Sequence, residues 1–182
     1  VTYEWETRSQ TRYAIVHAER FPLETPFSHV TARTAFLARH CASRASKCLL
    51  AMDATGLGIP VIRLMRDEDL GPAHFLPVTI TDGGRQHFSG DTHKVPKPDL
   101  VSGLTAVIES GELAYARGID VRPLAAEMST FGARLRPTGH TEYGGPHDDL
   151  VLALCLALWA SRLADHGPRP VVIPGFPGKD WI

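Results

Sequence analysis

Three aspartates carry the most informative chemistry in this sequence. Asp53 follows the apolar run 48–52, and Asp148 and Asp149 stand directly before the apolar run 150–159. A carboxylate at the carboxyl end of a buried parallel strand lies where open α/β sheets bind ligands. An acidic pair at the start of a buried helix is held at the positive amino end of that helix. If the helix packs over the end of the strand, the three carboxylates meet in one cleft.

Clustered carboxylates repel one another, and a bound divalent cation commonly offsets this repulsion. Ligands that are all oxygen favour Mg²⁺ or Mn²⁺ over zinc. A second interpretation needs no ligand, because Asp148 can be a helix cap and Asp53 a turn residue. The spacing alone leaves both interpretations open.

Other catalytic patterns are excluded by the motifs they require. An apolar run that ends in Asp also occurs in nucleotide triphosphatases, but the sequence has no GxxxxGK[ST] phosphate loop. The histidines show no HxxxH or HExxH spacing, which excludes the common zinc motifs. There is no GxSxG, and Cys41 and Cys48 have no catalytic partner in view.

The composition indicates one ordinary soluble domain. The chain has 182 residues, of which 43% are hydrophobic and 21% charged. Its net charge is −1, so the protein as a whole does not attract nucleic acid or an anionic membrane electrostatically. Three cysteines without CxxC spacing suit a reducing compartment. No uncharged apolar run of membrane-spanning length and no signal peptide is present, so we expect a cytoplasmic protein with no membrane partner.

The hydrophobic spacing predicts the elements that must position the aspartates. The predicted strands cover 1–5, 13–18, 48–52, 76–81 and 113–116, and the predicted helices begin near 28, 60, 99, 124 and 148. Polar stretches at 85–94 and 139–146 predict loops. This order indicates an α/β fold with a mixed sheet, in which the first two strands form an antiparallel hairpin. We expect one domain over 1–165, followed by a Pro/Gly-rich arm over 166–182.

Four segments resemble a known family. They are 52–58 (MDATGLG), 77–81 (PVTIT), 95–101 (VPKPDLV) and 147–154 (HDDLVLAL). In this order they resemble the nuclease domain of phage terminase large subunits, which has an RNase H-like (RuvC-like) fold. The similarity extends from about Tyr13 to Arg162, which is most of the chain.

The resemblance implies three acidic positions around two Mg²⁺ or Mn²⁺ ions. Asp53 matches the second position, and Asp149 is the first choice for the third, with Asp148 as its neighbour or alternative. The first position, on a central strand, has no clear match. No Asp precedes Asp53, and Glu4 and Glu6 are the only acids in the first predicted strand.

Three interpretations of this departure stay open. The chain is a shortened form that lacks its first strand, or Glu4 or Glu6 stands in, or the domain is a remnant without full catalysis. A first residue that is Val rather than Met favours the shortened form. The ATPase part of a terminase is absent from this sequence, so we expect no DNA pumping by this chain alone.

The predicted function is therefore that of a metal-dependent DNA endonuclease domain in phage DNA packaging. The resemblance implies double-stranded DNA, and other terminase or portal components, as partners in the cytoplasm of a bacterial host. A catalytically incomplete, DNA-binding or packaging-associated remnant is the alternative, and a Holliday-junction resolvase-like nuclease shares the same fold.

Basic residues that can contact phosphates are scattered along the chain. Lys97 lies in the VPK turn, and from 25 to 52 every charged residue is basic. The candidate contacts are Arg33, Arg39, Arg44, Lys47, Arg63, Arg66, Lys94 and Lys97. For the residues from 25 to 52, a solvated helix face is the competing interpretation.

Overall fold

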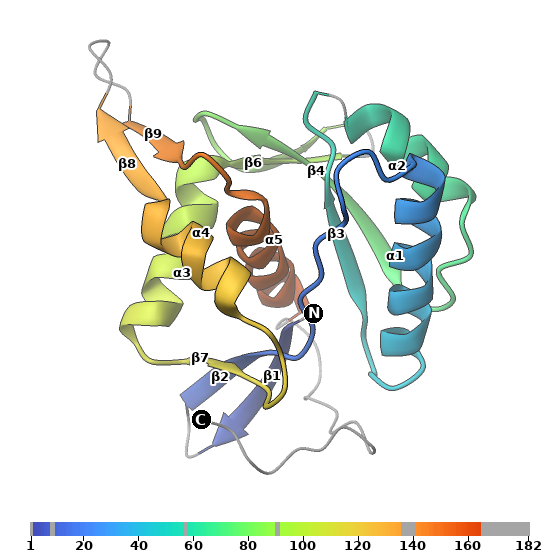
Figure 1. Ribbon diagram of the computed structural model, residues 1–182, viewed down its shortest axis with the longest axis horizontal. Coiled ribbons are helices and arrows are strands. Elements are labelled where there is room, and N and C mark those ends of the chain that lie inside the picture. Colours follow the sequence, from blue (N-terminus) through green and yellow to red (C-terminus); the bar gives the residue numbers. More distant parts are fainter. Residues whose placement is uncertain (1, 8–9, 57, 90–91, 136–140, 165–182) are drawn as a thin grey trace.

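The computed structural model describes residues 2–7, 10–56, 58–89, 92–135 and 141–164 (Figure 1). The arm predicted over 166–182 lies outside the described residues. Five helices are present in the described ranges: α1 (Phe27–Ala42), α2 (Gly58–Asp67), α3 (Lys97–Glu109), α4 (Arg122–Thr130) and α5 (Asp149–Ala164). In these ranges, no helix has the length and apolar character needed to cross a membrane.

The strands form three sheets. They are β1 (Thr2–Thr7), β2 (Gln10–Ile15), β3 (Leu49–Asp53), β4 (His74–Thr81), β5 (His87–Ser89), β6 (Thr92–Pro96), β7 (Leu113–Tyr115), β8 (Gly132–Leu135) and β9 (Thr141–Gly144). The first sheet has the order β1-β2-β7, with an antiparallel β1-β2 hairpin as predicted and β7 parallel to β2. The second has the order β3-β4-β6-β5, and its first three strands are parallel. β8 and β9 form a separate hairpin. The predicted α/β class with mixed strand directions is confirmed.

Helix α5 is the centre of the fold (Figure 1). It packs against α3, α4, β3 and β1. Its buried side chains include Val151, Leu154, Cys155, Leu158 and Trp159. Burying a side chain of this size contributes roughly 1.5–3 kcal/mol. The prediction of a buried last helix is therefore confirmed.

Two predicted loops are wrong, because each contains strands. The stretch 85–94 holds β5 and the start of β6, and 139–146 holds β9. β5 is exposed throughout, and only Val95 and Pro96 are buried in β6. These strands are held by backbone pairing to their neighbours, which leaves no alternation of apolar residues for sequence reasoning to detect.

The start of α3 also differs from the prediction. The sequence predicts that this helix begins near 99, but α3 begins at Lys97 with Pro96 in the cap position, and no side chain caps it. Pro98 suits the first helical turn, because its ring presets φ and its absent N–H would be unpaired there in any case. Asp99 therefore lies inside the first turn, and Lys97 lies at the amino end of α3.

Candidate carboxylate site

The carboxyl edge of the second sheet brings the two predicted acidic motifs to the same end of the molecule. Strands β3, β4 and β6 are parallel, so their carboxyl ends share one edge. Lys97 directly follows β6, and its Nζ lies 3.2 Å from Oδ2 of Asp148, which directly precedes α5. The amino end of α5 therefore lies at the edge where β3 ends in Asp53 (Figure 1). Positions far apart in the sequence thus share this edge.

Asp53 is the exposed last residue of β3, at the start of the turn that leads into α2. Its Oδ1 accepts hydrogen bonds from the backbone N–H of Thr55 at 2.8 Å and from the Thr55 hydroxyl at 2.5 Å. The same hydroxyl oxygen accepts from the backbone N–H of Ile80, in β4, at 2.9 Å. Oδ1 of Asp53 therefore has the hydrogen bonds of a turn residue, which is the interpretation that needs no ligand. These contacts hold the carboxylate at the end of β3.

Asp148 has a basic partner that its sequence neighbours do not reveal. Its carboxylate and the Lys97 ammonium are both half-buried, with 24% and 22% of their side chains exposed. Gly144 of β9 leaves room for the pair, since a Cβ at this position would lie 3.3 Å from Asp148 Oδ2. Lys97, predicted as a phosphate contact, is thus already paired with a predicted metal ligand. Asp149, the first residue of α5, is exposed.

Glu127 of α4 belongs to this site and was not singled out from the sequence. Its side chain is 5% exposed, and its Oε2 accepts hydrogen bonds from the backbone N–H groups of Leu150, at 2.8 Å, and Val151, at 3.2 Å. Its Oε1 forms an ion pair with the guanidinium of Arg20. One signal was available: Glu127 is three residues after Leu124, on the apolar face of its helix.

The donor set fits a hard cation only in part. Its oxygens come from Asp53, Asp148 and Asp149, and carboxylate oxygens are what Mg²⁺ and Mn²⁺ prefer. However, Lys97 occupies one of the carboxylates, and no group of three His, Cys, Asp or Glu side chains in the described part of the chain is arranged to hold a metal ion. Glu4 and Glu6 lie on β1, and their side chains fall outside what the structure describes.

Two of the thiols, Cys155 and Cys48, are poor nucleophiles. Burial raises the pKa of Cys155, in α5, to about 12, although the nearby Lys97 ammonium opposes this shift. Burial likewise raises the pKa of Cys48 to about 11. Because the thiolate is the reactive form, both residues are structural at neutral pH.

The predicted phosphate contacts do not form one patch. Lys47 and Arg44 precede β3, so they lie at the sheet edge opposite to Lys97. On α1, Arg33 forms an ion pair with Glu19 at 2.9 Å, and Arg39 donates a hydrogen bond to the backbone carbonyl of Asp69. The remaining candidates lie on α2 (Arg63, Arg66) and on β6 (Lys94). The residues are as scattered in space as in the sequence.

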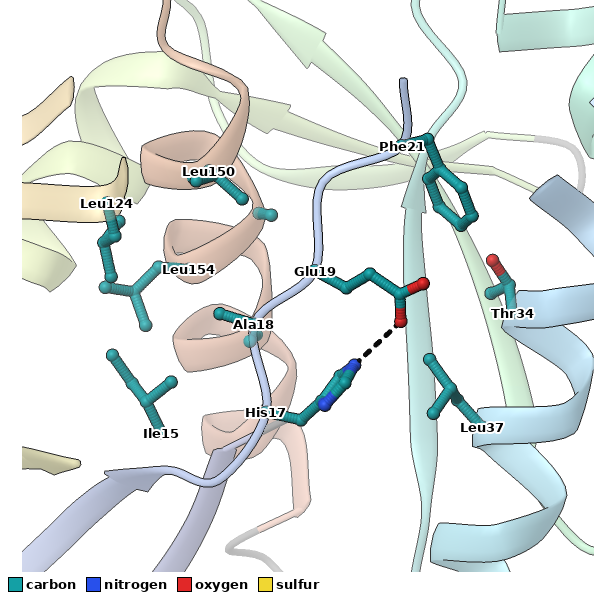
Figure 2. A pocket seen from close by; sticks show the side chains of 12 residues that line it. Ile15, His17, Ala18, Glu19, Phe21, Thr34, Leu37, Leu124, Leu150 and Leu154 are labelled. Atoms are coloured by element: carbon teal, nitrogen blue, oxygen red, sulfur yellow. Dashed lines mark hydrogen bonds and ion pairs between the residues drawn. The ribbon is translucent and has the colours of Figure 1, made fainter. Parts of the chain in front are cut away.

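A mainly apolar pocket of about 210 Å³ lies between α5 and α1. The linker from β2 to α1 lines it, and on this linker His17 and Glu19 are hydrogen-bonded at 3.0 Å (Figure 2). The α5 wall consists of Leu150, Ala153, Leu154 and Ala157. Ala153 is exposed, so this face of α5 is not fully covered.

Comparisons with protein-family models, with curated proteins and with solved structures gave no match. The site is therefore interpreted from its own geometry, in which the carboxyl end of β3 and the amino end of α5 share one edge.

Proposed function

We propose that this chain is a metal-dependent DNA endonuclease domain similar to those of phage terminases. The observation that carries the proposal is the placement of Asp53 and of the Asp148-Asp149 pair at one edge of the second sheet. Carboxylate oxygens, here carried by a strand end and by a helix start, are ligands that Mg²⁺ and Mn²⁺ prefer. The substrate would be double-stranded DNA.

The proposal includes an RNase H-like arrangement, which the sheet order supports. β1 and β3 are the end strands of their sheets, and α5 packs against both. One additional strand between β1 and β3 would join the two sheets into a single mixed sheet lying on α5. The terminase resemblance places its first acidic position on a central strand, and this is where that strand would lie.

In this proposal the chain's own residues hold and orient the cation. Asp53 is fixed by Thr55, and Asp149 lies at the positive end of α5. Lys97 pairs with Oδ2 of Asp148, so a cation bound at this oxygen would replace Lys97, and the displaced ammonium would then be free to contact a phosphate. When bound, two such ions supply an activated water and stabilise the leaving oxygen of the scissile phosphate.

A catalytically incomplete DNA-binding remnant is the second candidate. The ion pair between Lys97 and Asp148 favours it, because it neutralises one of the expected ligands. The two candidates differ in what Mn²⁺ does, since only a ligand that binds the folded state raises the midpoint temperature of unfolding.

The test measures thermal unfolding with millimolar Mn²⁺ and nicking of supercoiled plasmid. The proteins are the chain itself, Asp53→Asn, Asp149→Asn and the control Asp120→Asn, which removes an exposed carboxylate before α4. We expect Mn²⁺ to stabilise the chain and the control but neither site variant. Stabilisation without nicking would show that Asp53 and Asp149 form a cation site that does not by itself support cutting. No stabilisation, or equal stabilisation of all four proteins, would overturn the proposal.

A further inference from the structure

We infer that Glu127 is a positioning residue that caps α5 from a neighbouring helix and so leaves the carboxylates of Asp148 and Asp149 available to a cation. The inference rests on the proposed function for the cation itself. The capping part stands on contacts that the structure shows, and it is tested separately below.

The first step concerns the amino end of α5. The first N–H groups of a helix lack partners within the helix, and the residue directly before the helix commonly accepts from them with its side chain. In α5 this residue is Asp148, whose backbone carbonyl accepts from the N–H of Leu152 at 2.8 Å. Aspartate is among the best residues for this task. Yet the Oδ2 of Asp148 contacts the Lys97 ammonium instead.

The second step shows what replaces the Asp148 side chain. The N–H groups of Leu150 and Val151 both donate to Oε2 of Glu127, which comes from α4. The other oxygen of Glu127 is paired with Arg20, on the linker between β2 and α1. A buried carboxylate is costly unless its charge is balanced, and here the positive end of α5 and the Arg20 guanidinium both oppose the negative charge of Glu127.

The third step is the consequence for the site. While Glu127 occupies the helix end, the carboxylates of Asp148 and Asp149 are not needed there. Without the Glu127 carboxylate, the N–H groups of Leu150 and Val151 would lose this acceptor, and the side chain of Asp148, which directly precedes the helix, would turn back over the helix end. The cation would then lose a ligand even though no ligand had been removed. Glu127 would thus affect cation binding without touching the cation.

The first experiment measures Mn²⁺ affinity by titration at a temperature where every variant is folded. The variants are Glu127→Ala, Glu127→Gln, which keeps a carbonyl acceptor in place, and the control Glu109→Gln at the exposed end of α3. We expect affinity to fall about tenfold or more in Glu127→Ala and to be largely retained in Glu127→Gln and the control. A folded Glu127→Ala protein with unchanged affinity would overturn the inference, because a purely structural role changes the unfolding midpoint alone.

The second experiment needs no metal and remains decisive if Glu127→Ala does not fold. Asp148→Asn and Asp148→Ala both remove the charge that pairs with Lys97, but only asparagine keeps a side chain that can cap a helix. If Asp148 does not cap α5, the two variants should lower the midpoint temperature of unfolding by similar amounts. A clearly larger loss in Asp148→Ala would show that Asp148 caps α5 itself, and it would overturn the inference. If the unmodified chain fails to bind Mn²⁺ while these two losses agree, the proposed function fails and the capping assignment stands.

Discussion

At the level of single residues, Thr55 connects Asp53 to the sheet. Its hydroxyl donates to the Asp53 carboxylate, and the same oxygen accepts from the Ile80 N–H of the next strand. The Thr55 side chain therefore orients Asp53, a candidate metal ligand, and connects the end of β3 to β4.

We expect Thr55→Val to weaken Mn²⁺ binding and to lower stability by about 1–2 kcal/mol, because two hydrogen bonds are lost and each typically contributes about 1 kcal/mol. Valine keeps the shape of threonine but has no hydroxyl, so Asp53 and Ile80 each lose a partner. Mn²⁺ titration and urea unfolding measure the two effects. The control is Thr105→Val, whose hydroxyl bonds only to the preceding turn of α3 at Val101. Equal Mn²⁺ affinity in Thr55→Val and the control would contradict the expectation.

The residue scale also shows where sequence reasoning reached the site and where it failed. Asp53 and Asp149 were identified because each borders an apolar run, and an apolar run predicts a buried strand or helix. Lys97 and Asp148 are 51 positions apart, and only the packing of α3 against α5 brings them together. Glu127 was overlooked because one acid in a helix of mixed composition is usually on the surface. Its role depends on a helix end that is distant in sequence.

At the level of elements, the linker from β2 to α1 is tied down by charged contacts. Glu19 accepts hydrogen bonds from both the Nε and Nη2 of Arg33 on α1, and Arg20 reaches Glu127 on α4. The hydrogen bond from Arg33 is the main cause that lowers the pKa of Glu19 below its ordinary value. The linker is therefore connected through ion pairs to helices on either side of it.

Arg33→Ala should lower stability at pH 7 but not at pH 3. A carboxyl group whose pKa is lowered by folding stabilises the folded state above its unfolded pKa, and this contribution is lost as the pH falls through the lowered value. Both side chains are about one-third exposed, so the effect should be under about 1 kcal/mol. Urea unfolding at the two pH values measures it, with Arg63→Ala on α2 as the control. A loss of equal size at both pH values would show that Arg33 acts through packing.

The elements also differ in how well the sequence predicts them. Long apolar or amphipathic segments, such as α1, α2, β3 and α5, were found close to their observed bounds. The stretches predicted as loops contain β5, the start of β6 and β9, and β8 was not predicted, because most of the side chains in these strands are exposed. Backbone hydrogen bonding defines these strands, and it leaves little trace in residue type.

At the level of the whole molecule, charge sets the limits for DNA binding. The net charge is −1, and the candidate basic residues lie at two edges of the second sheet and on α1 and α2. We expect binding to double-stranded DNA to be weak, to show no sequence preference, and to fall steeply with salt because the contacts are with phosphates. Fluorescence titrations between low and half-molar salt test this. Tight binding that persists in half-molar salt would contradict it.

The division of the strands into two sheets is the other property of the whole molecule. β1 and β3 each end a sheet, and both lie against α5. Open strand edges are places where a further strand can pair. If cutting requires three carboxylates, this chain should nick DNA poorly, because Asp53 and Asp149 together cannot hold two ions against the water that Mg²⁺ gives up reluctantly.

We therefore expect an added strand that carries one Asp to restore nicking. The strand is fused ahead of β1 through a short Asn-Gly turn, which suits antiparallel pairing. Four proteins are compared on supercoiled plasmid with Mn²⁺: the chain itself, the chain extended with the Asp strand, the same extension with Asn in place of Asp, and the Asp extension carrying Asp53→Asn. Only the second should cut, since Asn keeps the shape of Asp and removes its charge. Strong nicking by the unextended chain would show that another residue, such as Glu4 or Glu6, supplies the third carboxylate. Cutting by the Asp53→Asn protein would show that the metal site lies elsewhere.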